Sequence, residues 1–410
     1  MKYLVAVDDC FLDRPGGMGR VAWDIALLMR DRGHTVAMVA ARPQPSTEAS
    51  HVSVHDGIRV LRYSRPPLAS WHPFRAQRII RAARSATQQH FGRERWDVVH
   101  MHSALTAAGV LAAVGGGPRY VYTLHSPITM EQQINWASQG AVGQLKLISG
   151  LGILARIERQ VLSACEHIHT LSEYSRAQLE DIHGTNGRVS VIPHWQRPAL
   201  RREHTRAEAR QQLGWPVDEA ILLTVRTLAA RYGVDIAIRA VAPMARQGQC
   251  AFAIGGDGPQ QASLTHLAQS LNAGERIWFL GRLTEPQLAL AYQAADLFLL
   301  PTRALECFGL IVLEALACGC PVLGTDAGAI PELLRPILPD YIVPAGDDAA
   351  LQEKVQAFLA GRLSRTPEAQ LIAHVQQYFG KSVIAPRIAA LLEDGVAMHS
   401  TLMEAAPSCM

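Results

Sequence analysis

The sequence predicts an α/β protein built from parallel sheets that are covered by helices. Short apolar runs rich in Val, Ile and Leu alternate with segments of helical period from one end of the chain to the other. Hydrophobic residues make up 49% of the chain and charged residues 18%, which provides enough apolar material for packed cores. At roughly 150 residues per domain, the 410 residues predict two or three domains.

In the first half, short β-rich runs mark the expected strands and the longer amphipathic segments between them mark the expected helices. The expected strands are Tyr3–Val7, Thr35–Ala40, Ile58–Leu61, Val98–His100, Tyr120–Leu124, His167–Leu171 and Val189–Ile192. The expected helices are Gly19–Arg32, Phe74–Gln89, Ala104–Val114, Ile153–Cys165 and Arg176–Ile182.

The second half shows the same alternation. The expected strands are Ala220–Val225, Cys250–Ile254, Ile277–Leu280, Leu297–Leu300, Pro321–Gly324 and Tyr341–Val343. The expected helices are Asp235–Arg246, Gln260–Leu271, Glu285–Ala294, Leu310–Cys318, Ile330–Leu334 and Asp348–Ala360.

The segment Pro193–Arg210 is expected to link the two halves, because it has two prolines, five arginines and little apolar periodicity. We therefore predict an N-terminal domain at residues 1–195, a C-terminal domain at 196–377 and a final segment at 378–410. Ligands of open parallel sheets bind beyond the carboxyl ends of the strands. The expected binding site is a cleft between two such lobes.

Charge and cysteine content limit the partners and the compartment. The formal net charge of +3 does not indicate nucleic acid as a partner. The seven cysteines are scattered without the spacing of a zinc ribbon or a CxxC redox site, which favours a reducing cytosol. We see no leader and no apolar stretch of the roughly 20 residues that a membrane span needs. We expect a cytoplasmic protein.

The most informative motif runs from Glu306 to Glu314, where a loop after an expected strand leads into an expected helix. The free N–H groups and positive dipole end of that helix favour an anion. Gly309 allows close approach of a ligand to the backbone. Two carboxylates beside an anion site suit a ligand with both phosphates and hydroxyls, such as a nucleotide sugar. The alternative is that Glu306 caps the helix and Glu314 is a solvated helix residue.

The residues around this motif resemble the retaining glycosyltransferases of family 4, which have the GT-B fold of two Rossmann-like lobes facing a central cleft. The matching residues are Pro301, Thr302, Glu306, Phe308, Gly309, Glu314, Ala315, Gly319, Pro321, Val322, Gly328, Pro331 and Glu332. The resemblance implies that Glu306 binds donor-sugar hydroxyls and that Glu314 binds the ribose. It also implies that the backbone of Cys307, Phe308, Gly309 and Leu310 binds the sugar and the distal phosphate.

Two arginines follow another expected strand, where they can clamp a diphosphate and stabilise the leaving group. They are Arg226 and Arg231, and the family usually has Lys at the second position. Arg keeps the charge but replaces a point donor with a planar fork. The alternative is a pair of solvated loop arginines.

Further site residues are expected at other strand ends. Gly16 and Gly17 resemble the family's glycine loop over the donor phosphates, whereas their spacing does not fit the dinucleotide fingerprint. Gly256 resembles a turn of the donor lobe and also suits a simple tight turn. Arg282 is similar in position to the segment that meets the nucleobase.

His125 follows the expected strand Tyr120–Leu124, and the family has a functionally important His after this strand. We therefore expect His125 to contact the sugar or to shape the reaction centre. His100, His102 and Glu173 are secondary candidates, and a structural role suits each equally well. The sequence contains no Asp-x-Asp motif, so we expect neither a metal nor a cofactor.

Eight arginines and one glutamate lie between Arg62 and Arg95, together with Trp71 and Phe74. Arg75, Arg78, Arg81 and Arg84 recur every three residues, as expected for a site that contacts a membrane surface or an anionic acceptor. A solvated helix face is the alternative. Peripheral contact with the inner face of the membrane is therefore one expectation.

We expect a metal-independent retaining hexosyltransferase. Its donor would be a nucleoside-diphosphate sugar, with UDP favoured over GDP, and its acceptor a hydroxyl of a glycan, a lipid-linked sugar or a small molecule. The final residues, from Tyr378 to Leu392, are similar to the family's last helix, which crosses back to the first lobe. Alternatives are a non-catalytic two-lobe sugar-binding protein and an epimerase or hydrolase that acts on nucleotide sugars.

Overall fold

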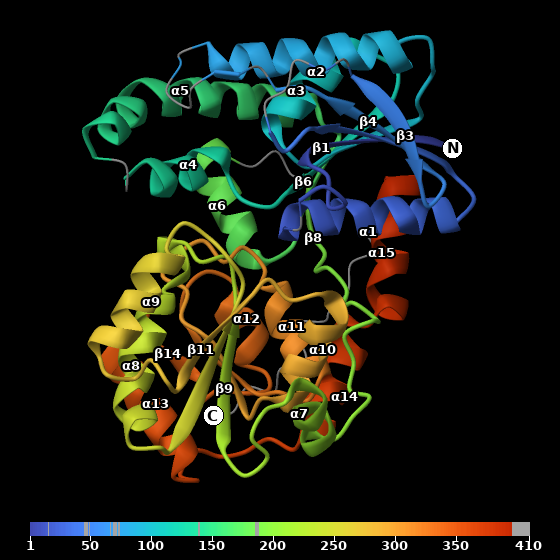
Figure 1. Ribbon diagram of the computed structural model, residues 1–410. Helices are drawn as coiled ribbons and strands as arrows, with labels where there is room; N and C mark the ends of the chain where they lie inside the picture. Colours follow the sequence, from blue (N-terminus) through green and yellow to red (C-terminus); the bar gives the residue numbers. More distant parts are fainter. Residues whose placement is uncertain are drawn as a thin grey trace. The chain divides into compact units, whose positions relative to one another are not determined.

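The chain forms two α/β units, each built on its own sheet (Figure 1). The computed structural model describes residues 1–14, 16–44, 48, 50–65, 67–68, 72, 74–137, 140–184 and 188–395. Met1–Pro193 forms the first unit and His194–Ile384 the second, and the chain belongs to the first unit again from Ala385.

The sheet of the first unit has the order β3-β4-β2-β1-β5-β6-β7-β8. Its strands are β1 (Lys2–Asp9), β2 (Thr35–Ala41), β3 (His51–His55), β4 (Ile58–Tyr63), β5 (Val98–Met101), β6 (Arg119–Leu124), β7 (His167–Thr170) and β8 (Val189–Val191). All pairs are parallel except β3–β4. After β1 the next strand, β2, lies on one side of the β1–β5 pair, and after β5 the next strand, β6, lies on the other side. The loops that follow β1 and β5 therefore lead away from each other.

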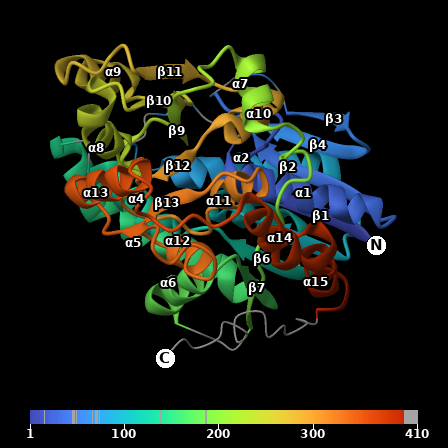
Figure 2. The same ribbon diagram turned by 90° about the horizontal axis from the view of Figure 1, so that it is seen from below.

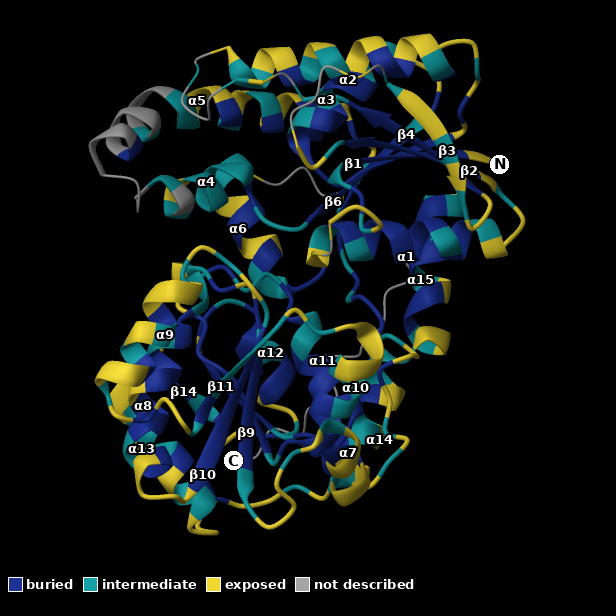
Figure 3. Cartoon of the chain, viewed as in Figure 1, coloured by how far each residue is buried: buried dark blue, intermediate teal, exposed yellow. Residues whose placement is uncertain are grey.

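Helices cover both faces of this sheet. They are α1 (Gly17–Asp31), α2 (Arg75–Phe91), α3 (Ala104–Val114), α4 (Ile128–Ala137), α5 (Gly140–Ala164), α6 (Glu173–His183) and, mostly within this unit, α15 (Lys381–Asp394). Helix α3 packs against both α2 and α5 on one face, and α1 lies on the other (Figures 1 and 2). The central strands of this sheet are buried between the two helical layers, whereas the edge strand β3 is largely exposed (Figure 3).

The sheet of the second unit is wholly parallel, in the order β11-β10-β9-β12-β13-β14. The strands are β9 (Ala220–Val225), β10 (Cys250–Gly255), β11 (Ile277–Gly281), β12 (Leu297–Leu300), β13 (Val322–Thr325) and β14 (Ile342–Val343). Numbered within the unit, this is the Rossmann order 3-2-1-4-5-6. The predicted fold class of parallel α/β lobes is confirmed.

The helices of the second unit are α7 (Arg206–Leu213), the 3₁₀ turn η1 (Ala230–Tyr232), α8 (Val234–Arg246), α9 (Gln261–Ser270), α10 (Glu285–Ala294), α11 (Leu310–Ala317), α12 (Ile330–Leu334), α13 (Asp348–Leu359) and α14 (Glu368–Phe379). Helices α8, α9 and α13 cover one face of the sheet, and α7, α10, α11 and α14 cover the other (Figure 1). No helix in the described part of the chain combines the length and the apolar character needed to cross a bilayer.

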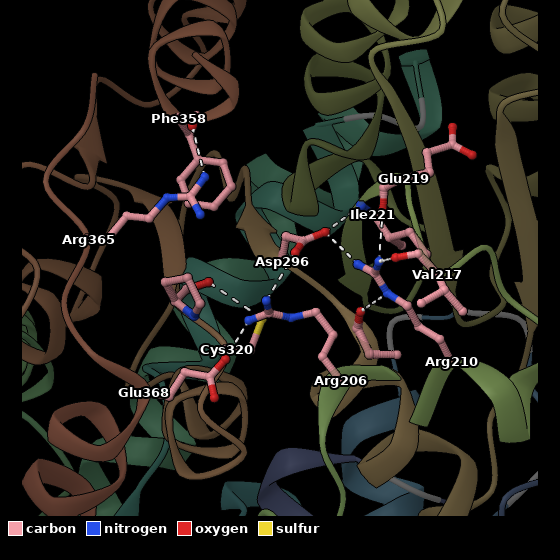
Figure 4. Close-up of polar contacts among 12 residues, drawn as sticks. Arg206, Arg210, Val217, Glu219, Ile221, Asp296, Cys320, Phe358, Arg365 and Glu368 are labelled. Atoms are coloured by element: carbon pink, nitrogen blue, oxygen red, sulfur yellow. Dashed lines mark hydrogen bonds and ion pairs between the residues drawn. The ribbon is translucent and has the colours of Figure 1, made fainter. Parts of the chain in front are cut away.

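The segment predicted as a linker is structured over much of its length. Thr205 and Glu208 form a capping box that starts α7. Arg206 and Arg210 approach Asp296 from two sides, with nitrogen–oxygen distances of 3.4 and 2.6 Å, and Arg206 also pairs with Glu368 (Figure 4). These arginines therefore fix α7 to its own unit and are not cations of a free linker.

The arginines of the basic segment from Arg62 to Arg95 differ in exposure. Arg62 is buried and forms an ion pair with Asp13, and Arg65 forms one with Asp9. Arg78, Arg81 and Arg84 on α2 are exposed, as are Arg93 and Arg95 after it. Trp71 lies outside the described residues.

Candidate donor site

Two loops of the second unit leave its sheet at the point where the strand order reverses. Strands β9 and β12 are neighbours, with Leu297 opposite Leu222. The next strand after β9 lies on one side of this pair and the next strand after β12 lies on the other. The loops at residues 226–233 and 301–309 therefore border one crevice, which is where ligands of such sheets bind. Arg226, Arg231 and Glu306 all lie on these two loops.

Arg226 and Glu306 contact each other across this crevice. The Arg226 Nη2 donates to Glu306 Oε2 at 2.7 Å, although the two residues are 80 positions apart. Arg226 is 9% exposed, and its buried Nη1 has no hydrogen-bond partner within the described part of the chain. A buried guanidinium with an unused donor can bind an added anion at little further cost of desolvation.

Arg231 and Arg226 share one aromatic neighbour. The guanidinium carbons lie 4.6 and 4.3 Å, respectively, from the centroid of the Tyr232 ring. Arg231 also donates to the Tyr232 hydroxyl. Cation–π contacts of this kind hold like charges near each other and limit the rotamers of the long side chains. The structure thus brings together the two cations that the sequence placed on one loop.

The loop before α11 has an unusual backbone at both ends of the Glu306–Gly309 stretch. Leu305 has a φ of 55°, in the left-handed region that non-glycine residues rarely adopt. Gly309, the N-cap of α11, has a φ of 92° and supplies no side-chain cap. The first turn of α11 therefore presents uncapped N–H groups, which favour an anion.

The residues from Glu306 to the start of α11 differ in how far their side chains are buried. The Phe308 side chain is buried, with its ring 6.5 Å from that of Phe379, so Phe308 offers a ligand only its backbone. Cys307 and Leu310 are partly exposed. The Cys307 Sγ lies 4.0 Å from the Leu305 carbonyl oxygen.

Glu314 is held on both carboxylate oxygens. Its Oε1 accepts from Arg197 at 2.8 Å (Nη2) and 3.0 Å (Nε), and its Oε2 accepts from the Tyr292 hydroxyl at 3.1 Å. The side chain is 11% exposed. Glu314 is therefore not the solvated helix residue that sequence reasoning kept as an alternative. Arg197 was not predicted as a site residue, because nothing local to it indicates a partner 117 positions away.

Gly256 and Arg282 lie on turns at the edge of the same sheet. A Cβ on Gly256 would lie 1.8 Å from the Arg226 carbonyl oxygen, and its φ is 114°, so this turn packs directly under the Arg226 loop. The Gly256 N–H donates to the Gly281 carbonyl at 2.7 Å. Arg282 is 62% exposed and lies 3.2 Å from Asp257.

In the first unit, Gly16 and Gly17 begin α1 at the end of the loop after β1. Both are exposed, and a Cβ on either would meet no atom within 4 Å. Close packing requires a glycine at position 19, because a Cβ on Gly19 would lie 2.7 Å from the Asp9 carbonyl oxygen. Gly16 and Gly17 therefore leave open space above the first turn of α1. Pro15 lies outside the described residues.

His125 ends a chain of histidines in the first unit. Its Nε2 lies 3.0 Å from Nδ1 of buried His102. Deeper in the sheet, His100 Nε2 lies 2.7 Å from Thr123 Oγ1, which lies 3.0 Å from His169 Nδ1. Burial, and then the charges of His169 and His125, lower the pKa of His100 to about 3, so this ring is neutral.

The direction of the inner hydrogen bonds follows from their last acceptor. His169 Nε2 lies 2.6 Å from the Ile192 carbonyl oxygen, which can only accept, so Nε2 carries a proton. In a neutral His169 ring, Nδ1 then accepts from Thr123, whose hydroxyl oxygen accepts from His100 Nε2. Among the described residues, no group of three His, Cys, Asp or Glu side chains is arranged to hold a metal ion.

Family models match both units. Residues 205–372 match the model of group 1 glycosyl transferases, and residues 15–195 match that of glycosyltransferase family 4. The chain belongs to glycosyltransferase family 4. Secondary structure, sheet order and these matches agree with the resemblance seen in the sequence.

Curated relatives of this family 4 member include D-inositol 3-phosphate glycosyltransferases. The protein of Catenulispora acidiphila is 30% identical over 275 residues, which span 64% of either chain. That of Xylanimonas cellulosilytica is 26% identical over 375 residues, 88% of this chain and 89% of the relative. The first of these matches therefore spans less than two thirds of the relative's length.

Solved structures of glycosyltransferases share the GT-B fold. Sucrose-phosphate synthase of Thermosynechococcus elongatus superimposes with a TM-score of 0.77 at 23% identity, covering 96% of this chain and 98% of its own. Anabaena HepE in complex with UDP and glucose superimposes with a TM-score of 0.71 at 19% identity, covering 96% of this chain and all of its own. At these identities the likeness shows the fold.

Proposed function

We propose that this chain transfers a hexosyl group, with retention of anomeric configuration, from a nucleoside-diphosphate sugar to a hydroxyl acceptor, without a metal ion. The second unit binds the donor and the first unit binds the acceptor. The observation that carries the proposal is the contact of Arg226 with Glu306, where the sheet order of the second unit reverses.

This contact supports separate roles for the residues that bind the diphosphate, the sugar and the ribose of the donor. Arg226, Arg231 and the N-terminus of α11 bind the diphosphate and stabilise the charge that develops as it leaves. Glu306 accepts hydrogen bonds from sugar hydroxyls, and Glu314 accepts them from the ribose. His125 contacts the transferred sugar. Retention follows if the acceptor attacks from the face that the diphosphate leaves, with the departing phosphate as the base.

UDP is the proposed nucleotide, and GDP is the second choice. Two structures of Anabaena HepE contain UDP or UDP with glucose, whereas that of a starch synthase from Arabidopsis thaliana contains ADP. A melting screen against UDP, GDP and ADP tests the choice. A nucleotide at 100 times its dissociation constant stabilises the protein by about 2.7 kcal/mol.

Incubation with a panel of nucleotide sugars, with and without acceptors, tests the reaction. The acceptors include D-inositol 3-phosphate, because the curated relatives are named for it. Nucleotide release that requires an acceptor supports transfer. Donor consumption without acceptor indicates an epimerase or hydrolase, and sugar binding independent of nucleotide indicates a sugar-binding protein. NMR of the product's anomeric proton tests retention, and inversion contradicts it.

Two variants test the assigned residues. Glu306→Ala and Arg231→Ala are expected to lower kcat/KM by at least about a hundredfold, because each removes a contact to the reacting donor. Arg246→Ala, which removes an exposed cation at the end of α8, is the matched control and keeps full activity. Turnover near the wild-type value in either site variant contradicts the assignment.

We also propose that α2 contacts an anionic membrane surface. Arg78, Arg81 and Arg84 are exposed, α2 contains no acidic residue, and Phe74 at its N-cap is 55% exposed. Sedimentation with phosphatidylglycerol vesicles tests the contact. Replacing these three arginines with Gln is expected to abolish binding, whereas Arg239→Gln with Arg246→Gln on α8 leaves it unchanged. Equal loss in both variants indicates only non-specific charge attraction.

A further inference from the structure

Arg197 lies in the segment that begins the second unit, and all of its guanidinium nitrogens are engaged. Its Nε and Nη2 lie 3.0 and 2.8 Å from Glu314 Oε1, and its Nη1 lies 2.8 Å from Glu285 Oε1. Arg197 and Glu314 are each 11% exposed. Burial lowers the pKa of Arg197, but the charges of Glu314, Tyr292 and Glu285, together with the hydrogen bond to Glu314, raise it above its ordinary value, so this guanidinium is charged.

The other oxygen of Glu314 is fixed from a different helix. The Tyr292 hydroxyl donates to Oε2 at 3.1 Å from α10, and Tyr292 is 1% exposed. Burial, and then the Glu314 carboxylate, raise the pKa of Tyr292 well above its ordinary value, so the hydroxyl keeps its proton. Glu314 is thus held between two donor side chains.

The segment that carries Arg197 is itself anchored. His194 and Trp195 are buried, and the Gln196 N–H donates to the Phe379 carbonyl at 2.8 Å. The Lys381 ammonium lies 6.0 Å from the centroid of the Trp195 ring. The contacts of the three residues before Arg197 therefore fix its position.

We propose that Arg197 is a positioning residue for the donor's ribose: it orients the Glu314 carboxylate so that the site selects nucleoside diphosphates carrying both ribose hydroxyls. This inference rests on the proposed function, in which Glu314 binds the ribose. Without Arg197, the carboxylate loses its fixed rotamer and its charge partner. The loss is therefore expected to weaken the binding of the ribose and to leave the binding of the diphosphate and the base unchanged.

A double-mutant cycle between the protein and the nucleotide tests this role. Dissociation constants are measured by calorimetry for UDP, 2′-deoxy-UDP and 3′-deoxy-UDP, and for the corresponding guanine nucleotides. In the wild-type protein, loss of one hydroxyl is expected to weaken binding about tenfold. In Arg197→Met, UDP binds about tenfold more weakly, and the deoxy analogues bind about as well as UDP.

Two variants provide the comparison. Glu314→Gln is expected to reduce the discrimination between UDP and its deoxy analogues in the same way. Arg201→Met, which removes an exposed arginine that pairs with Glu203 in the same segment, keeps the wild-type discrimination. If Arg197→Met weakens UDP and the deoxy analogues by the same factor, Arg197 has only a structural role and the inference is overturned.

Folding is checked by thermal melting, because Arg197→Met takes the cation away from a buried carboxylate. If Arg197→Met does not fold, Arg197→Lys decides the question, since Lys keeps the charge without the two-pronged contact. In Arg197→Lys, the discrimination between UDP and its deoxy analogues is expected to fall below the wild-type value. An unchanged discrimination overturns the inference. Failure of the wild-type protein to bind UDP, GDP or ADP overturns the proposed function as well. Binding of UDP with unaltered discrimination in the variants overturns this inference alone.

Discussion

Gly256 shows how one backbone position supports the candidate donor site. A Cβ there would lie 1.8 Å from the Arg226 carbonyl oxygen, at a φ of 114°. We predict that Gly256→Ala lowers the free energy of unfolding by about 1–3 kcal/mol and weakens nucleotide binding, because the Arg226 loop must move. Urea unfolding and calorimetry measure the two effects.

Gly214→Ala is the matched control for Gly256. Gly214 also has a positive φ, of 68°, but a Cβ on it would meet no atom within 4 Å. Gly214→Ala is expected to lower the free energy of unfolding by only about 1 kcal/mol and to leave nucleotide binding unchanged. Equal effects of the two substitutions on binding would show that the contact with Arg226 is unimportant.

The His102–His125 pair provides a second prediction for a single residue. The two ring nitrogens lie 3.0 Å apart, so His102 orients the ring of His125. His102→Leu removes this hydrogen bond and is expected to lower kcat about tenfold, with a small effect on the KM for the donor. His102→Asn keeps a polar group near the Nδ1 position and should restore much of the rate.

The result for His102 is checked by steady-state kinetics and by ¹⁵N NMR of the histidine side chains. A shift in the His125 ring signals of His102→Leu would report the lost hydrogen bond. An unchanged kcat in a folded His102→Leu variant would show that His125 needs no orientation from His102.

Among the elements, α15 is tied to the first unit by both side-chain and backbone contacts. Glu393 accepts from Arg32 at 2.6 and 2.7 Å and lies 2.7 Å from His34 Nε2. The Tyr3 hydroxyl donates to the Leu392 carbonyl at 3.0 Å. Hydrogen bonds from Arg32, and then from His34, lower the pKa of Glu393 from 4.5 to about 2.

The depressed pKa of Glu393 predicts a pH-dependent contribution to stability. Because the carboxylate is favoured in the folded state, its contribution is complete above about pH 4.5 and is lost as the pH falls toward 2. Glu393→Gln is expected to lower the free energy of unfolding by about 1–2 kcal/mol at pH 7, given the partial exposure of Arg32. The difference from the wild-type protein should shrink below pH 4.5.

Denaturant titrations between pH 7 and 3.5 measure this difference. Glu353→Gln, on the exposed face of α13, is the control and should track the wild-type protein at every pH. A deficit for Glu393→Gln that stays constant down to pH 3.5 would show that the ion pair is not its cause.

Sequence reasoning missed some elements for identifiable reasons. Strand β3 was not predicted because its valines face outward, with Val54 66% exposed, so the run has no apolar inner face. The Asp56-Gly57 pair, with φ values of 47° and 77°, is a hairpin signal that could have revealed it. Helix α7 was likewise signalled by Thr205 and Glu208, but the surrounding arginines masked its period.

For the whole molecule, the chain enters the second unit at His194 and belongs to the first again from Ala385. Removal of residues 385–410 takes away the buried side chains of Ile388, Leu391 and Leu392. At about 1.5–3 kcal/mol for each large apolar side chain, the loss is several kcal/mol. We predict that the first unit loses protection against hydrogen exchange while the second unit keeps it.

Hydrogen exchange followed by mass spectrometry tests this prediction, with peptides from β1, β5 and β6 reporting on the first unit. Truncation after Asp394, which keeps α15, is the control. Equal loss of protection in both units would show that α15 stabilises the chain generally and not the first unit in particular.

The sequence by itself determined the order of most strands and helices and the strand ends that carry Glu306, Arg226 and His125. Periodicity and turn residues act over a few positions and can be read directly. Only the tertiary structure decided which of these residues meet. Strand β12 lies beside β9, and this pairing brings Arg226 to Glu306. Arg197 reaches Glu314 across 117 positions, and no local pattern encodes contacts of such separation.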